Sequence, residues 1–554
     1  MPEADIIIIN GAVLTMDHTR LRAEAVALRS GRILAVGDRA TISELGTPRT
    51  RIVDAKGGSV LPGFVESHLH LFVGGAELGR VLLNDRTTLG QASAKLRSYA
   101  ATHMDEPAIV GVANGYRLFA DTVPRLALDR IIPDRPLALI SDDHHTVWAN
   151  TIALQKCELL HGRDLPSGHE VVMGNDGLAN GTLLEPEAFG PVLHLAGMGR
   201  VFLGMETGRD PAPTPSPQDR AQDLVFLRCG LSHLVAQGIT SIVNMDGNRY
   251  TLDLLEELRA ADELNARVRV PFHFLPDMTE ADLDVAAEMD QRWKGDWLNS
   301  GFVKMFMDGV VESNTAFMKQ DYPGRPGWRG SGRFSAERFR DLATRIDAMG
   351  LQMAVHAIGD AAVARVLNGY EAAIRTNGAR DLRHRIEHIE LADPDDLPRI
   401  GALGLIASMQ PLHAPENGPK ADNPALLAIP QDRWPQAFPM RRLRKLGTHM
   451  ALASDWPVVT ASVLDGIHGA VTSEPWRDGH PKRRLSLHDA IHGYTLGGAY
   501  AEHSETTKGS LSPGKFADVV ILDRDIEAVA PQEIKSMAIR ATICGGRFTF
   551  DRLS

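Results

Sequence analysis

The stretch Ser59-Val60-Leu61-Pro62-Gly63-Phe64-Val65-Glu66-Ser67-His68-Leu69-His70 carries an apolar run into two histidines one residue apart. Side chains on a β-strand alternate between its two faces, so His68 and His70 point the same way and both imidazoles can reach one cation. The chain contains 21 histidines, and a single His-x-His pair is therefore a weak signal. The stretch predicts a strand with a metal site at its end, provided that further ligands converge on it.

The composition limits the classes of function. With 554 residues and a formal net charge of -11, the chain is long enough for several domains and lacks the positive surface that binds polyanions. Its most basic run is Arg441-Arg442-Leu443-Arg444-Lys445. We therefore expect no nucleic acid partner.

Targeting and redox features favour the cytoplasm. The first apolar run, Ile6 to Ile9, suits a strand and is too short for a signal peptide. No stretch approaches the roughly 18 apolar residues that a membrane span needs. The three cysteines, Cys157, Cys229 and Cys544, are far apart, which favours a reducing compartment without disulfides or a thiolate metal site. We expect a cytoplasmic protein without membrane contact, whose metal ligands are histidines and carboxylates.

Between the two ends of the chain, strand-like and helix-like segments alternate in the manner of parallel βα units. Amphipathic segments such as Ser335 to Met349 and Asp360 to Thr376 separate eight predicted strands. The first strand ends at His68, and the others span Gly238 to Asp246, Arg267 to Phe274, Phe302 to Asp308, Leu351 to Ile358, His384 to Leu391, Gly404 to Gln410 and His449 to Trp456. The pattern predicts an α/β fold built on a (β/α)8 TIM barrel.

Two additions to the barrel are predicted. The gap between the first and second strands is too long for one crossover and closes with the proline-rich run Asp210 to Pro217, so residues 90–220 are predicted to form an inserted subdomain over the barrel mouth. Short strands and glycine turns fill residues 1–60 and recur in residues 506–554, which are predicted to form one small β-sandwich domain together. The barrel then comprises residues 61–89 and 221–505.

The candidate metal ligands fall at or near the carboxyl ends of the predicted strands, where barrel enzymes build their active sites. They are His68, His70, Lys304, His356, His388 and Asp455. A single barrel histidine is more often a hydrogen-bonded core residue than a ligand. The convergence of the whole set on one end of the barrel nevertheless favours a metal centre.

These motifs make the chain resemble the amidohydrolase superfamily, and within it the YtcJ-like branch, amidohydrolase family 3, which includes N-substituted formamide deformylases. The resemblance rests on Leu61-Pro62-Gly63-Phe64 before His68 and His70, on Lys304 with Asp308-Gly309, on His356-Ala357-Ile358-Gly359-Asp360, on Glu387-His388 and on Ser454-Asp455-Trp456-Pro457. All of these stand in the family's order and cover nearly the whole chain. His144 and Glu66 depart from the family pattern, in which glycine and aspartate are common at these places.

The resemblance implies a binuclear metal centre. One divalent ion would be held by His68, His70 and Asp455, and the other by His356 and His388, with Lys304, carboxylated by carbon dioxide, as the bridge. Neutral histidines cancel none of the four positive charges, so a carbamate on Lys304 would supply a needed anion. Zinc suits these ligands best, although the same ligands also bind manganese, iron or nickel. The alternative is that Lys304 is an ordinary barrel lysine neutralised by Asp308 or Glu312.

The implied reaction is metal-dependent hydrolysis of a carbon–nitrogen bond in a small-molecule substrate, an amide or an N-substituted formamide. The two ions would polarise the carbonyl and activate water, while Asp455 carries a proton to the leaving amine. One alternative is a ring deaminase, or an ester or carbamate hydrolase, of the same superfamily. Ring deaminases usually lack the lysine on strand four. A non-catalytic regulatory protein is the other alternative, and such a scaffold has no need of six metal-binding side chains.

Further side chains are predicted to line the substrate pocket: His145, Trp148, Phe306, Phe317, His413 and Trp456. Most aromatic residues nevertheless belong to protein cores. Glu387 and Asp360 are predicted to orient His388 and His356, or else to form plain ion pairs. A homodimer is expected from the symmetry preference of soluble enzymes. The loops that determine the substrate leave its identity open.

Overall fold

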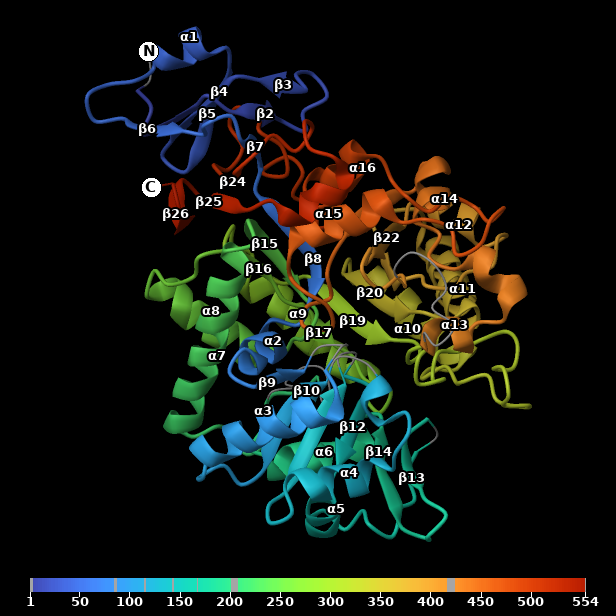
Figure 1. Cartoon of the computed structure of the whole chain (residues 1–554). Coiled ribbons are helices and arrows are strands. Elements are labelled where there is room, and N and C mark those ends of the chain that lie inside the picture. The colour runs from blue at the N-terminus through green and yellow to red at the C-terminus, as the bar shows by residue number, and fades with distance from the viewer. Residues whose placement is uncertain are drawn as a thin grey trace.

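The computed structural model describes residues 3–83, 87–113, 116–141, 144–166, 168–200, 208–415 and 424–553. Three groups of strands are visible in Figure 1. The central group consists of parallel strands. A second group, around β10 to β14, follows the first central strand in the chain, and a third group contains strands from both chain ends. The fold is therefore α/β, with both parallel and antiparallel sheets.

Each of the eight predicted central strands has a counterpart. The strands are β8 Phe64–Leu69, β15 Ile239–Asn244, β16 Arg267–Arg269 with β17 Phe272–His273, β19 Phe302–Phe306, β20 Gln352–Ala357, β21 Arg385–His388, β22 Ile406–Met409 and β23 His449–Leu452. They pair in parallel in two sheets, of order β18-β16-β15-β8 and β17-β19-β20-β21-β22-β23. The short strand β18, Leu298–Asn299, is absent from the predicted set.

The third predicted strand is divided between the two sheets. Its halves, β16 and β17, are separated by Val270 and Pro271, and proline has no N–H to donate to a sheet.

The two sheets also meet at β8, the edge strand of one, and β23, the edge strand of the other. Asp455 N donates to His68 O and His70 N donates to Trp456 O, each at 2.8 Å. The carboxyl ends of β8 and β23 therefore lie side by side.

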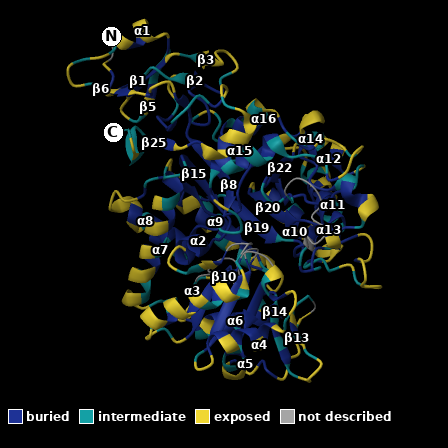
Figure 2. Cartoon of the chain, in the orientation of Figure 1, coloured by how far each residue is buried: buried dark blue, intermediate teal, exposed yellow. Residues whose placement is uncertain are grey.

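Amphipathic helices cover the central strands. In α10, Ala336–Ala348, the buried residues Phe339, Leu342 and Ile346 recur every three or four positions, and the side chain of Ser335 caps the first turn. Four other helices also bury one face: α7 Pro217–Val235, α8 Arg249–Ala260, α9 Leu283–Arg292 and α11 Asp360–Asn377. Figure 2 shows the central strands buried and the outer sides of α7 and α8 exposed.

Two short helices precede the C-terminal strands: α16, Leu487–Gly493, and α17, Leu496–Ala501. A Cβ at Gly493 would lie 2.5 Å from Cγ of Leu452, and a Cβ at Gly497 would lie 2.4 Å from the carbonyl oxygen of Met450. Glycine at both positions therefore lets the two short helices approach β23 closely.

The insert has its own six-stranded sheet, with order β13-β14-β12-β11-β10-β9. The strands are β9 Val81–Leu83, β10 Ile109–Ala113, β11 Leu137–Ser141, β12 Thr146–Ala149, β13 Glu170–Met173 and β14 Ala179–Leu184, flanked by α3 Leu89–Thr102, α4 Pro124–Ile131, α5 Thr151–Lys156 and α6 Pro186–Leu195. This sheet begins at β9, before residue 90. The insert also encloses hydrophobic cores of its own.

The two chain ends share one sheet, of order β26-β25-β24-β7-β2-β3. Its strands are β2 Ala12–Leu14, β3 Arg22–Ala23, β7 Ser59–Pro62, β24 Val519–Leu522, β25 Ile539–Cys544 and β26 Arg547–Asp551. A second sheet, β5-β4-β1-β6, comprises β1 Ile6–Ile9, β4 Ala25–Arg29, β5 Arg32–Gly37 and β6 Arg51–Asp54. One hydrophobic cluster joins the two sheets, with Ile8 and Val26 from one and Val519 and Ile543 from the other. Within the described residues, no helix combines the length and the apolar character that a membrane crossing needs.

Candidate metal centre

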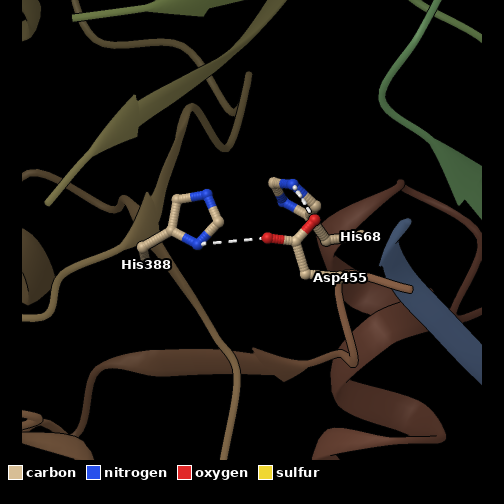
Figure 3. A group of neighbouring side chains, drawn as sticks. All are labelled: His68, His388 and Asp455. Atoms are coloured by element: carbon tan, nitrogen blue, oxygen red, sulfur yellow. Dashed lines mark ion pairs between the residues drawn. The ribbon is translucent and has the colours of Figure 1, made fainter. Parts of the chain in front are cut away.

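His68, His388 and Asp455 lie together at the carboxyl ends of β8, β21 and β23 (Figure 3). One potential ligand atom from each residue lies within 4.8 Å of the others, and all three residues are buried. The Oδ1 atom of Asp455 is 3.4 Å from Nε2 of His68, and its Oδ2 atom is 3.8 Å from Nδ1 of His388. Buried imidazole and carboxylate groups at this spacing are suitable for holding a divalent cation.

His70 and His356 extend this group on either side. Nε2 of His70 lies 3.1 Å from Oδ1 of Asp455. The His356 ring centroid is 4.5 Å from that of His388, which in turn is 4.8 Å from that of His68. The structure therefore brings all four predicted histidine ligands and Asp455 into one continuous cluster.

Each of these histidines has one ring nitrogen beside an acceptor. Nδ1 of His68 lies 2.6 Å from Oε2 of Glu387, and Nδ1 of His70 lies 2.6 Å from Oδ1 of Asp246. The remaining two pairs are Nε2 of His356 with Gly309 O at 3.1 Å and Nδ1 of His388 with Oε1 of Gln410 at 3.0 Å. Such contacts fix the tautomer and the ring orientation, and for His68 and His70 they leave Nε2, which faces Asp455, for a metal.

Several buried polar atoms at the centre fit a metal group better than a simple hydrogen-bonded core. Among the described residues, His68 Nε2, Lys304 Nζ and Asp455 Oδ1 are buried and have no hydrogen-bond partner. Burial would raise the pKa of Asp455, but His68, His70 and His388 hold it well below its usual value. A carboxylate and imidazole nitrogens gathered without hydrogen-bond partners are the donor set that a divalent ion satisfies.

Lys304 is fully buried, and its Nζ atom has no hydrogen-bond partner among the described residues. Burial lowers the pKa of Lys304 to about 8, because its effect is larger than that of the nearby carboxylates of Glu387 and Asp455, which raise this pKa. Asp308, the proposed alternative partner, instead accepts backbone N–H groups from Phe317, Ile358 and Gly359. A lysine in this state has an accessible neutral amine, which is the form that can accept carbon dioxide.

The backbone is unusual at two of the candidate ligands. His388 has φ 77° and Asp455 has φ 66°, values that side-chain-bearing residues rarely adopt. Glu66 supports one of these turns, because its Oε1 accepts N–H from Ser454 at 2.9 Å. Strained backbone of this kind clusters at functional sites, where the surrounding structure maintains it.

Three of the predicted pocket residues lie beside the metal centre. The Phe306 ring centroid is 4.8 Å from that of His356, and the His145 ring centroid is 6.2 Å from it. His413 stacks against His388 with 5.7 Å between centroids, and its Nε2 lies 3.7 Å from Oδ2 of Asp455. These side chains border the cluster on two sides.

The other three predicted pocket residues pack elsewhere. Trp148 belongs to a hydrophobic core of the insert, 5.3 Å from Phe119 between centroids. Phe317 lies under the guanidinium of Arg365, and Trp456 stacks on His233 of α7 with 5.2 Å between centroids. These three aromatic rings therefore pack against other parts of the chain, and the sequence pattern does not show which neighbours they have.

The orienting acids also differ from the prediction. Glu387 contacts His68 and not His388, because its side chain points across the strand ends toward β8. Asp360 lies 2.8 Å from Nη1 of Arg433, and the described part of the chain shows no hydrogen bond or ion pair between Asp360 and His356. The predicted orienting role for Asp360 is therefore wrong, and its alternative, a plain ion pair, is what the structure shows.

Sequence reasoning missed three residues that support the centre. Asp246 follows β15 and contacts His70, and Gln410 follows β22 and contacts His388. Arg385 is fully buried and binds Glu387 through Nε at 2.7 Å and through Nη2 at 3.0 Å. The position of Asp246 and Gln410 directly after buried strands was the available signal.

Comparisons with known proteins identify the family. The model of the amidohydrolase family matches residues 51–550. Protein LONG AFTER FAR-RED 3 of Arabidopsis thaliana is 28% identical, covering 98% of this chain and 91% of its own. Putative amidohydrolase YtcJ of Bacillus subtilis is 26% identical over 98% of both chains, and N-substituted formamide deformylase of Arthrobacter pascens is 26% identical over 99% of this chain and 98% of its own.

Solved structures share the fold. An uncharacterized metal-dependent hydrolase from Pyrococcus furiosus superposes with a TM-score of 0.69 at 24% identity, covering 95% of this chain and 99% of its own. An adenosine deaminase from Xanthomonas campestris, solved with bound zinc, superposes with a TM-score of 0.53 at 14% identity, covering 100% and 94%. The family match confirms the resemblance predicted from the strand-end motifs. The chain belongs to the amidohydrolase family and is a hydrolase of carbon–nitrogen bonds.

Proposed function

We propose that the chain hydrolyses an amide or an N-substituted formamide at a binuclear centre inside a closed (β/α)8 barrel. The observation that carries the proposal is the arrangement of four histidines with anchored ring nitrogens and Asp455 near the unpaired amine of Lys304. The hydrogen bonds between the ends of β8 and β23 support the closed barrel. The similarity to an N-substituted formamide deformylase supports the substrate class.

In this proposal, His68, His70 and Asp455 bind one ion, His356 and His388 bind the other, and carboxylated Lys304 bridges them. Zinc is the proposed metal, since neutral imidazole and carboxylate donors suit it. When bound, the ions polarise the substrate carbonyl and lower the pKa of a water molecule. The buried amine of Lys304, with its lowered pKa, supports the carbamate.

Asp455 performs the proton transfer. Its carboxylate accepts the proton of the water that adds to the carbonyl carbon, and then donates that proton to the nitrogen as the carbon–nitrogen bond breaks. Its depressed pKa keeps the carboxylate ionised before the reaction. The products are a carboxylic acid, formic acid for a formamide, and an amine.

The test combines metal analysis with a substrate panel of formamides, amides, carbamates and esters. Purified wild-type protein should hold about two ions per chain and hydrolyse a formamide or amide, and Asp455→Asn should reduce kcat by about 10²–10⁴-fold. Lys304→Ala should lower the metal content. Lys294→Ala, at an exposed lysine paired with Asp290, is the matched control and should change neither quantity.

The proposal fails if metal-replete protein hydrolyses no member of the panel and Asp455→Asn leaves the metal content unchanged. Hydrolysis restricted to esters or ring substrates would favour the other chemistries of the superfamily. Location in the cytoplasm and assembly as a homodimer stay predictions from the sequence. Cell fractionation and light scattering test them.

A further inference from the structure

A polar bridge connects the insert to the central strands beside the metal centre. Nδ1 of His145, just before β12, lies 2.9 Å from Oε1 of Glu185, which stands between β14 and α6. The second carboxylate oxygen of Glu185 accepts from Nη2 of Arg333 at 2.8 Å. Arg333 lies between β19 and α10, so the carboxylate of Glu185 joins the insert to the segment after β19.

Glu185 is held firmly in this position. It is 2% exposed, and its backbone N–H donates to His145 O at 3.0 Å. Its φ of 66° is rare for a residue with a side chain, which indicates that the surroundings impose it. The backbone and the side chain of Glu185 therefore both position His145.

The bridge reaches the backbone that orients a metal ligand. A Cβ at Gly309 would lie 2.1 Å from Oγ1 of Thr315 and 3.0 Å from Oε1 of Glu185, so glycine leaves room for both side chains. The carbonyl oxygen of Gly309 is 3.1 Å from Nε2 of His356. Glu185 therefore lies next to Gly309, whose carbonyl oxygen contacts His356.

His145 also lies near His356. Its ring centroid is 6.2 Å from that of His356, and its side chain is 13% exposed. Nδ1 of His145 contacts Glu185, so a hydrogen bond from His145 to a substrate would be made through Nε2. The positive charge of Arg333 balances the negative charge of Glu185.

We infer that the insert completes the active site, with His145 donating a hydrogen bond to the acyl group of the substrate and Glu185, held by Arg333, as its positioning residue. The inference rests on the proposed function and assigns the insert a direct part in substrate binding. It also gives a physical reason for the buried carboxylate where the insert meets the central strands.

The experiment measures binding of acetohydroxamate, a small metal-binding acyl analogue, to metal-replete protein by calorimetry. His145→Ala and Glu185→Gln should each weaken binding about tenfold, the equivalent of one hydrogen bond, with unchanged metal content. Glu187→Gln is the control, because it removes the same charge from an exposed residue two positions away. The His145→Ala/Glu185→Gln double variant should bind no more weakly than His145→Ala alone, since Glu185 acts through His145.

Three results overturn the inference. Equal binding by wild type, His145→Ala and Glu185→Gln would exclude the role of the insert while the proposed function stands. Loss of metal in either variant, or additive losses of binding in the double variant, would show that His145 and Glu185 only support the structure and do not act on the substrate as proposed. Absence of both metal and acetohydroxamate binding in the wild type would refute the proposed function itself, and the inference with it.

Discussion

At the scale of single residues, the acceptors behind the histidines determine which ring nitrogen faces the centre. Asp246 and Glu387 are fully buried carboxylates that contact His70 and His68 at 2.6 Å. Burial lowers the pKa of His68 to about 4, so this imidazole is neutral at physiological pH and able to bind a cation. These acceptors therefore help to orient the candidate metal ligands.

Asp246→Asn should weaken metal binding by about 10- to 100-fold, because an amide orients and polarises His70 less well than a carboxylate. Metal competition with a chelator measures the affinity. Asp105→Asn, at an exposed aspartate of the insert, is the control. Equal affinities for Asp246→Asn and the control would show that Asp246 is dispensable.

A second residue-scale prediction concerns acid stability. Although burial raises the pKa of Asp347, its contacts with His384, Asn377 and Arg380 lower it to about 2. Because this folded value lies below the unfolded value of about 3.9, Asp347 contributes about 2 kcal/mol above pH 4, and this contribution is lost as the pH falls toward 2. The melting temperature of Asp347→Asn should thus lie below that of wild type at pH 6, and the difference should narrow below pH 4. Asp341→Asn, at an exposed site in the same helix, should show no such pH dependence.

At the scale of elements, α2, Leu71–Glu77, packs directly against the segment that presents Asp455. A Cβ at Gly74 would lie 2.3 Å from the ring of Trp456, so only glycine permits this contact. His70 is the N-cap residue of α2, and Leu71 N donates to Oδ1 of Asn244 at 2.8 Å. The position of α2 therefore couples β8, β15 and β23 at the metal centre.

Gly74→Ala should destabilise the protein by about 1–3 kcal/mol, because the rigid Trp456 ring must move. It should also reduce metal affinity through the neighbouring Asp455. Gly90→Ala in α3 is the matched control, since a Cβ there meets nothing within 4 Å. Thermal unfolding and metal titration compare the two variants, and similar behaviour of both would refute the packing argument.

At the scale of the whole molecule, a buried ion pair connects the central strands to the terminal sheets. Arg267 of β16 binds Asp518 through Nε at 2.8 Å and through Nη2 at 3.1 Å. Both side chains are 4% exposed, and the guanidinium also lies on the Phe516 ring. The C-terminal segment is therefore fixed to the remainder of the molecule by charge as well as by strand pairing.

Asp518→Ala should cost about 3–5 kcal/mol, because it leaves the charge of Arg267 buried and unpaired. Asp551→Ala breaks an ion pair with Arg51 at the surface of the same domain and should cost at most about 1 kcal/mol. Thermal unfolding of the two variants measures the contrast. A similar loss in both would mean that burial of the Arg267 pair has no energetic importance.

Much of the arrangement could be predicted because it depends on local patterns. Strand and helix alternation is visible in apolar periodicity, and parallel strands bring their carboxyl ends to one edge, so His68, His356 and His388 were found without a structure. The break at Pro271 was not predicted, because the sequence pattern predicts one strand over residues 267–274; the division into two sheets depends on the neighbouring strands.

The sequence by itself determined the family, the order of the central strands and the set of candidate ligands, since each is written in short contiguous motifs. Only the tertiary structure decided which groups orient them: Glu387 reaches His68 across 319 positions, and Asp246 reaches His70 across 176. It also decided that Trp456 packs against α7. Contacts of this kind depend on strand register and helix packing, which couple distant residues through the shared core and leave no local signal.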